Sequence, residues 1–591
     1  MRILLALAIG VSAVALSAPM AAQPGATAPQ SQDARFAAFG ERIVDQFLRL
    51  DPVGATQLGD HRYDRLLPDV STSGRAARRV FAESALAELA RFDKPRLGRE
   101  HQVDAILLED QLRYMLFSID RLQDWAWDPL IYAGTAGSSL FTLSSREFAS
   151  LPDRLRSATG RLQALPVFLE QSRAALVPAR VPRIHAETAA RQNAGLNGLI
   201  DELLAQKGTL PAPDRAALET AAAAAKGAVA THQEWLDKQL VPNARGNERL
   251  GAGLYDHKLR LALNSELRRQ DIRRRAEANI REFRAKMYSV AADIIKGRVG
   301  APPVPANPTL AQEQAVIEAG LAVVYADAPP RDQVLPFARE TLAQAIAFAK
   351  EKDLISFPKA SFNVIEMPEF MRGVAVAFAD MPGPLEPDQR GFYSVMPIPS
   401  DWTEERAGSF LREYNKWAIH ELTLHEGVPG HLLQLAHSNQ YKSRLRAFLQ
   451  SGPMVEGWAC YGEDVMADTG YLNRDPRYLL AHYKFLMRLP VNAILDQDFH
   501  VAGMTREQAM ELMTKTAFQE EREAAGKWVR MQLSSAQLPV YFVGYQEWKD
   551  FRAAAEKRPG FNLKRFHDAA LSHGSPPVRF IRQLELGEPI R

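Results

Sequence analysis

Three histidines and two glutamates lie within twelve residues of one short segment of the chain. The segment has the sequence His420-Glu-Leu-Thr-Leu-His-Glu-Gly-Val-Pro-Gly-His431. Neutral imidazoles are common zinc ligands, and a glutamate beside a ligand histidine acts as the general base in many zinc hydrolases. The composition of this segment therefore indicates metal-assisted hydrolysis.

The spacing of the histidines differs from the familiar H-E-x-x-H pattern, in which two ligands four residues apart share one helix face. His425 and His431 are six residues apart. On a regular helix this corresponds to about 600° at ~100° per residue, so the two rings would point in different directions. Pro429 and Gly430 lie between them, and both residue types disrupt a regular helix. A kink or bulge at this point could bring the two rings together.

A second segment, Met454-Val-Glu-Gly-Trp-Ala-Cys-Tyr-Gly-Glu-Asp-Val465, is consistent with a single helix. Its apolar stripe leaves Glu456 and Glu463, seven residues apart, together on a different face. In zinc sites with two histidines and one glutamate, the third ligand commonly comes from a following helix. Glu456 lies 25 residues after His431, which is enough for a turn and an antiparallel return. Glu463 could instead orient a ligand histidine.

Simpler interpretations remain open for several of these residues. His420 and Glu421 form a competing frame, in which His420 and His425 are five residues apart. Either glutamate of the second segment could be an ordinary acid on a helix surface. Cys460 lies four residues after Glu456, and we expect it to be a small buried thiol.

The elements that must position these residues are mostly helices. Helical patterns dominate residues 35–296; within 101–122, for example, apolar residues recur near a period of 3.6. Residues 297–308 contain four prolines, which forbid a continuing helix. Helical patterns return from Glu404 nearly to the end of the chain. We therefore expect a helical N-terminal half, 35–296, and a half with the metal site, 309–591, in one continuous body.

A small β-sheet is expected within the irregular stretch from about Ser356 to Trp402. Two short runs there, 372–379 and 391–396, stand out for their valine, phenylalanine and tyrosine residues. Such residues favour strands. The predicted fold class is therefore mainly α, with a small sheet in the second half of the chain.

The N-terminus predicts export. Arg2 precedes an apolar run, 3–16, and small residues continue to Ala22, which is typical of a secretory signal peptide over residues 1–22. The run is shorter than the ~20 apolar residues that a spanning helix needs, which disfavours the alternative of an uncleaved anchor. Residues 23–34 are polar and should form a disordered tether. We expect an exported protein, periplasmic or secreted, with no stable membrane insertion after cleavage.

Composition excludes some classes of function. The 591 residues contain 72 Lys and Arg against 70 Asp and Glu, a formal net charge of +2. This balance argues against a broad nucleic-acid-binding surface. A single cysteine, Cys460, excludes a disulfide scaffold, and it suits an oxidising compartment because it has no partner for mispairing within the chain.

The two motifs, His425-Glu-Gly-Val-Pro-Gly-His431 and Glu456-Gly-Trp-Ala-Cys-Tyr-Gly-Glu463, resemble the bacterial domain-of-unknown-function family 885, many of whose members are exported. The resemblance extends through Asp496-Gln-Asp-Phe-His500, Arg530, Gln537-Leu-Pro-Val-Tyr541 and Phe566-His-Asp568. This family looks like a distant relative of helical zinc peptidases such as thimet oligopeptidase and carboxypeptidase Taq. That similarity implies a large helical, zinc-peptidase-like body with a deep cleft, and a small sheet near the active-site helix.

The resemblance also implies a set of ligands and a general base. His425, His431 and Glu456 would hold one Zn²⁺ per chain and leave a coordination position for water. Glu426 would take a proton from this water and pass it to the leaving amine.

Further roles follow from the same resemblance. Tyr541 or His500 could stabilise the oxyanion of the tetrahedral intermediate. Arg530 could bind a substrate carboxylate, and Glu463 could orient a ligand histidine. The strand predicted at 391–396 could pair with the backbone of an extended peptide.

The sequence thus predicts an exported zinc metallopeptidase that cleaves small peptides. A hydrolase of non-peptide amides or esters would use the same groups. A different class, a non-catalytic exported binding protein on the same scaffold, is the alternative. Glu426 favours an enzyme, because a binding module does not need a carboxylate beside its first metal ligand.

Overall fold

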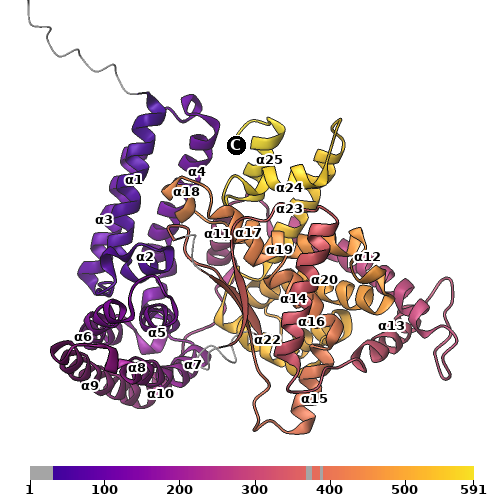
Figure 1. Cartoon of the computed structure of the whole chain (residues 1–591), viewed down its shortest axis with the longest axis horizontal. Coiled ribbons are helices and arrows are strands. Elements are labelled where there is room, and N and C mark those ends of the chain that lie inside the picture. The colour runs from indigo at the N-terminus through magenta and orange to yellow at the C-terminus, as the bar shows by residue number, and fades with distance from the viewer. Residues whose placement is uncertain (1–30, 368–375, 387–389) are drawn as a thin grey trace, which may run out of the picture.

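The computed structural model describes residues 31–367, 376–386 and 390–591 (Figure 1). The predicted signal peptide, 1–22, and most of the predicted tether lie outside the described residues. Helix α1 (Gln32–Leu50) begins within that tether, so residues 32–34 are helical and not disordered as predicted. The reason is local: the Ser31 hydroxyl caps the helix by accepting the Ala34 N–H, and an apolar face starting at Phe36 is buried.

The described part of the chain is mainly helical, as predicted. The helices up to residue 296 are α1, α2 (Pro52–Leu58), α3 (Thr72–Leu89), α4 (Arg99–Phe117), α5 (Leu130–Ser145), α6 (Leu151–Ala175), α7 (Arg183–Asn193), α8 (Gly195–Ala205), α9 (Ala212–Trp235), α10 (Val241–Asn243), α11 (Gly251–Leu263) and α12 (Arg269–Ile295). Irregular chain separates α12 from α13, as the prolines of residues 297–308 require.

The later helices surround the predicted metal motifs. They are α13 (Leu310–Tyr325), α14 (Val334–Glu351), α15 (Glu404–Glu413), α16 (Lys416–Glu426), α17 (His431–Ser438), α18 (Arg444–Phe448), α19 (Gly452–Thr469), α20 (Pro476–Gln497), α21 (Arg506–Glu511), α22 (Glu521–Leu533), α23 (Pro539–Glu556), α24 (Leu563–Leu571) and α25 (Val578–Leu586). Among the described residues, no helix is both long enough and apolar enough to span a membrane.

The sheet has three strands, β1 (Phe362–Glu366), β2 (Ala377–Asp380) and β3 (Gly391–Val395), in the order β1-β3-β2. β3 is parallel to β1 and antiparallel to β2. The strand predicted at 391–396 is confirmed as β3. The run predicted at 372–379 is a strand only from Ala377, and its residues 372–375 lie outside the described residues. β1 was not predicted from the sequence.

The sheet order corrects one prediction. Because β3 is paired with β1 on one side and β2 on the other, it has no free edge for a substrate peptide. β2 lies at an edge of the sheet, so β2 and not β3 is the strand on this side with which an extended peptide could pair.

Buried side chains form three main hydrophobic clusters. One joins α1–α4 with Leu445, Leu449 and Phe580 from the second half of the chain, and another fills the α5–α9 bundle. The largest runs from Tyr255 in α11 to Ile581 in α25. The break at 297–308 therefore lies inside the sequence span of one shared core. Helix α12, which precedes the break in the chain, packs along α20, which follows it. In Figure 1, α17 and α19 lie near the middle of the molecule, with α1–α10 on one side and α12–α13 on the other.

Candidate metal centre

The two histidines of the first motif lie on either side of a break between two helices. α16 ends at Glu426 and α17 begins at His431. Gly430 fits this break because a Cβ atom there would lie only 1.8 Å from the His425 carbonyl oxygen. The Trp458 indole N–H donates to the Pro429 carbonyl at 2.8 Å and ties the break to α19. The predicted kink is confirmed, and it brings the His425 and His431 ring centroids to 4.7 Å.

Glu456 on α19 meets both imidazoles. Its Oε2 atom lies 3.6 Å from Nε2 of His425 and 3.3 Å from Nε2 of His431. One ligand atom from each of the three residues lies within 4.8 Å of the other two. The next residue, Gly457, allows α19 to pack closely on α23, because a Cβ there would lie 2.3 Å from the Gly544 backbone. The structure thus brings together the three ligands that the family resemblance implies.

The chemistry of these three side chains fits a zinc ion. Among the residues that the structure describes, Glu456 Oε2 and His431 Nδ1 are buried and make no hydrogen bond of regular geometry, so Oε2 has only its ion-pair contacts with the two imidazoles. A buried carboxylate oxygen held in this way is costly unless a cation satisfies it. Two imidazoles and one carboxylate form a common set of ligands in catalytic zinc sites. His425, His431 and Glu456 could therefore hold Zn²⁺.

The surroundings of the ligands favour positive charge. Burial opposes protonation of His425, yet the Cys460 thiol and the Glu456 and Glu463 carboxylates raise the pKa of its imidazole well above its ordinary value. Burial alone would raise the pKa of Glu456, but His431 and His425 hold the pKa of this carboxyl well below its ordinary value. The raised pKa of His425 indicates a negative potential at its ring, which would also stabilise a divalent cation, and the lowered pKa of Glu456 keeps its carboxylate ionised and able to bind one.

Glu463 contacts His425, the first candidate ligand, which fits one of the roles that the sequence left open for this glutamate. Its Oε1 atom accepts a hydrogen bond from Nδ1 of His425 at 2.7 Å. This bond fixes the ring so that Nε2 points toward Glu456. Burial raises the pKa of Glu463 to about 7, although the hydrogen bond to His425 opposes the shift.

A buried network behind Glu463 was missed in the sequence. His482 lies between Glu421, 3.1 Å from its Nδ1, and Asp464, 3.3 Å from its Nε2. Burial disfavours its charged form, but the Glu421 and Asp464 carboxylates raise the pKa of His482 well above its ordinary value. The partners lie 61 and 18 residues away in the chain, so no local spacing indicates them.

The competing frame based on His420 is wrong. Its Nδ1 atom lies 3.0 Å from the Tyr471 hydroxyl, and its ring packs edge-on against Phe337. His420 is thus a buried residue with its own partners, separate from the three converging ligands. Cys460 is a buried thiol as expected, with its Sγ 3.9 Å from Nδ1 of His425. Burial raises the pKa of this thiol to about 12.

Glu426, the predicted general base, lies at the end of α16 beside the sheet. Its Oε2 atom accepts the Ala379 backbone N–H of β2 at 2.9 Å. The Glu426 side chain is buried, and Glu426 directly follows the candidate ligand His425 in the sequence. The hydrogen bond from β2 orients one carboxylate oxygen and leaves Oε1 for a proton transfer.

Tyr541 on α23 faces the ligands from the other side. Its ring lies nearly parallel to that of His425, with the centroids 6.5 Å apart. Its hydroxyl oxygen accepts from Arg530 Nη2 and from Gln537 Nε2, both at 3.3 Å, so its own O–H can donate elsewhere. Burial and the Glu456 carboxylate raise the pKa of Tyr541 to about 12, which keeps it protonated. Arg530 itself is exposed.

His500, which was expected as a candidate donor to the oxyanion, is bonded to backbone groups instead. Nε2 of its ring donates to the Ser534 carbonyl at 2.9 Å, and Nδ1 accepts the Leu250 N–H at 3.5 Å. With both ring nitrogens engaged by backbone, His500 has no free N–H for an oxyanion. It instead holds the loop that precedes α23.

Asp496 holds the same loop, which explains why it accompanies His500 in the sequence motif. Its carboxylate accepts the N–H groups of Ala536 at 3.0 Å and Leu538 at 3.4 Å. Ala536 has a φ of 57°, a left-handed conformation that is strained for a residue with a side chain. The loop leads directly to Gln537 and Tyr541, so Asp496 and His500 position these two side chains.

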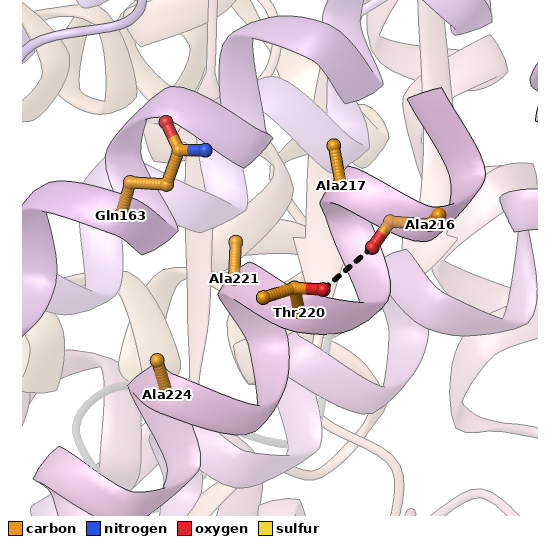
Figure 2. Close-up of a pocket in the computed structure, with 6 residues that line it drawn as sticks. All are labelled: Gln163, Ala216, Ala217, Thr220, Ala221 and Ala224. Atoms are coloured by element: carbon orange, nitrogen blue, oxygen red, sulfur yellow. Dashed lines mark hydrogen bonds between the residues drawn. The ribbon is translucent and has the colours of Figure 1, made fainter. Parts of the chain in front are cut away.

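An open cavity of about 480 Å³ adjoins the ligand Glu456. It extends from α19 to α11 and is lined by Lys258, Ala262, Gly452, Glu456, Leu533, Ser534, Ser535, Ala536, Gln537 and Val540. A second hollow, between α6 and α9, is lined by alanines with Gln163 and Thr220 (Figure 2). Thr220 there donates to the Ala216 carbonyl of its own helix at 2.9 Å. Only the first cavity contains residues of the candidate metal centre.

Comparisons with known proteins agree with the resemblance seen in the motifs. The model of DUF885, a bacterial protein family of unknown function, matches residues 52–584. None of the curated proteins matches the chain.

Two solved structures share the fold. A candidate lipoprotein of unknown function from Shewanella oneidensis is 32% identical, with a TM-score of 0.78 over 93% of this chain and 99% of its own. A candidate lipoprotein from Colwellia psychrerythraea is 16% identical, with a TM-score of 0.75 over 94% of this chain and 98% of its own. Both descriptions are consistent with the export predicted from the N-terminal sequence.

Proposed function

The chain belongs to the bacterial DUF885 family, and we propose that it is an exported zinc-dependent hydrolase, a metallopeptidase that cleaves small peptides in the periplasm or outside the cell. The observation that carries the proposal is the convergence of His425, His431 and Glu456 within 4.8 Å, with Glu426 directly after the first ligand. Three ligands with an adjacent carboxylate are the parts that zinc-assisted hydrolysis needs.

A zinc ion bound by these residues would act as a Lewis acid and lower the pKa of a coordinated water to ~7. Glu426 is oriented by the Ala379 N–H, so its Oε1 takes the proton of the attacking water and then delivers it to the leaving amine. The Tyr541 O–H, whose oxygen is already bound by Arg530 and Gln537, donates to the oxyanion. Glu463 keeps the His425 ring in place throughout.

The substrate backbone has a natural place beside β2. The Ala379 N–H donates to Glu426, so this side of the strand faces the general base and not β3. An extended peptide paired with β2 would therefore run past Glu426. Arg530, exposed beside Tyr541, supplies a cation for a carboxylate of the substrate.

Hydrolysis of non-peptide amides or esters would use the same residues, and a non-catalytic binding protein could keep the ligands alone. The position of Glu426 favours catalysis, because its carboxylate is held at the sheet edge and is not needed as a ligand. A cleavage assay separates these possibilities. The purified mature protein, loaded with zinc, is incubated with a mixed peptide library and with matched ester and anilide substrates.

Wild-type protein should cleave peptides, and Glu426→Gln should reduce kcat by about 10²- to 10⁴-fold, the usual contribution of a general base. Glu507→Gln, which changes an exposed glutamate on α21, is the matched control and should retain activity. Cleavage of esters alone would move the proposal to another hydrolase class. A zinc-loaded wild-type protein that cleaves nothing would favour the binding protein.

A further inference from the structure

The cavity beside Glu456 has an uneven distribution of charge. Of its lining residues only Glu456 and Lys258 are charged, and they come from different halves of the chain. Glu456 is a candidate metal ligand on α19, whereas Lys258 is on α11. The remaining lining residues are small, apolar or neutral. Lys258 is therefore the cation in the lining itself that a group entering from the metal centre meets.

The Lys258 ammonium group is directed toward the cavity loop. Its Nζ donates to the Ser535 hydroxyl at 2.8 Å, which uses one of its three N–H bonds. Ser535 lies within the loop that Asp496 and His500 hold through their hydrogen bonds to the backbone of Ala536 and Ser534. His185 of α7 contacts the end of α22 just before this loop, since its Nε2 lies 3.0 Å from the Gln532 carbonyl oxygen. The loop is thus fixed from both halves of the chain, and so is the position of the ammonium group.

The acids nearest to Lys258 have other partners. Asp124 accepts from the Ser118 hydroxyl at 2.7 Å and from the Trp125 N–H, and Asp128 lies 3.0 Å from Nδ1 of His185. Asp496 accepts two backbone N–H groups of the loop, as described above. Burial lowers the pKa of Lys258, and these carboxylates oppose that shift, while the hydrogen bond to Ser535 directs the ammonium into the cavity.

A second cation reaches the cavity wall from outside. Gln537 lines the cavity, and its Oε1 accepts a hydrogen bond from Arg530 Nη2 at 3.2 Å. Lys258 and Arg530 therefore bond to two residues of the same loop, Ser535 and Gln537, beside the candidate ligand Glu456. Two cations close to one small cavity favour an anionic occupant.

We propose that Lys258 binds a carboxylate of the substrate in this cavity, so that the enzyme selects peptides carrying a negative charge next to the scissile bond. This inference rests on the proposed function and names its substrate class. The carboxylate is either the C-terminus of the peptide or an acidic side chain, and both present the same chemistry to the ammonium. The cavity volume of about 480 Å³ suits one or two residues beyond the bond that is cleaved.

Three peptides of one sequence test the proposal on the zinc-loaded mature protein. One has a free C-terminus, one is amidated, and one is amidated with a glutamate beside the scissile bond. Wild type should prefer one of the two carboxylate peptides by about 10- to 100-fold in kcat/KM, the usual effect of a hydrogen bond to a charged group. Preference for the free C-terminus identifies the terminal carboxylate, and preference for the glutamate peptide identifies the side chain.

The variant Lys258→Met should abolish this preference and leave the rate on the neutral amidated peptide within about twofold of wild type. Lys258→Arg should restore part of it. Ser535→Ala removes the bond that directs the Lys258 ammonium into the cavity but keeps its charge, so the preference should weaken without disappearing. Lys238→Met, which changes an exposed lysine paired with Glu234, is the matched control. Equal cleavage of all three peptides by wild type, or an equal loss on all three in Lys258→Met, would overturn the proposal.

A binding measurement keeps the test independent of catalysis. Calorimetry should show that wild type binds N-acetyl-leucine or N-acetyl-glutamate amide about 10-fold or more tightly than N-acetyl-leucinamide, and that Lys258→Met does not. If this difference appears while no peptide is cleaved, the carboxylate site stands and the hydrolase proposal fails. If peptides are cleaved without any carboxylate dependence in either assay, the hydrolase proposal stands and the role of Lys258 fails.

Discussion

Replacing Glu463 by glutamine removes the negative charge beside His425 but keeps an oxygen that can accept its hydrogen bond. In the structure this bond joins Nδ1 of His425 to Glu463 Oε1 at 2.7 Å, and only 4% of the Glu463 side chain is exposed. Loss of such a charged partner behind a ligand histidine typically weakens metal binding by about 10- to 100-fold. At about 1.4 kcal/mol per tenfold, the expected cost is roughly 1.4 to 2.8 kcal/mol of zinc-binding free energy.

The zinc affinity is measured by competition with a chromophoric chelator for wild type and for Glu463→Gln. Asp468→Asn is the matched control, because it changes an exposed acid on the same helix, α19. The control should bind zinc as wild type does, and circular dichroism should show that both variants remain helical. An unchanged zinc affinity in a folded Glu463→Gln variant would refute the reasoning, because it would mean that Glu463 does not support a metal ligand.

Three further predictions follow from other parts of the structure. Gly430→Ala places a Cβ 1.8 Å from the His425 carbonyl oxygen. Urea denaturation should therefore show a loss of about 3 kcal/mol or more in the free energy of unfolding, together with loss of zinc. An alanine variant that binds zinc normally would contradict the account. Tyr541→Phe should keep its zinc but lower kcat by about 10²- to 10³-fold, and unchanged turnover would exclude Tyr541 as the oxyanion donor. Burial opposes protonation of His573, but the carboxylates of Glu100 and Glu585 raise its pKa to about 9. The protonated form of His573 therefore stabilises the folded state fully below pH ~6.5. This contribution, at most about 3 kcal/mol, is lost as the pH rises through 9. Denaturation between pH 6.5 and 9.5 should therefore show a smaller loss of stability in His573→Gln than in wild type, and equal slopes would count against the ion pair.

The local parts of the site could be predicted from the sequence. Pro429 and Gly430 predict a break between His425 and His431, because neither residue type continues a helix well. Helical periodicity places Glu456 and Glu463 on one face, which is why a ligand and a supporting carboxylate could both be assigned there. The close approach of Gly430 to His425 and of Gly457 to Gly544 shows why these glycines accompany the ligands.

The parts that depend on distant segments could not be predicted. His482 finds Glu421 and Asp464 only through the packing of α16, α19 and α20, and no spacing in the chain indicates that contact. His500 has a residue type suited to catalysis, but the backbone groups of Leu250 and Ser534 occupy its nitrogens. Lys258 lies almost two hundred residues before Glu456, and only the fold places both in one cavity.

The metal content of the purified mature protein tests the central claim most directly. Wild type, His431→Ala and Glu426→Gln are supplied with zinc, freed of excess metal and analysed by elemental mass spectrometry. The account predicts about one zinc per chain in wild type and in Glu426→Gln, and little or none in His431→Ala, because His431 is a ligand and Glu426 is not. Wild-type protein that holds no zinc after this treatment, or His431→Ala protein that holds as much as wild type, would contradict it.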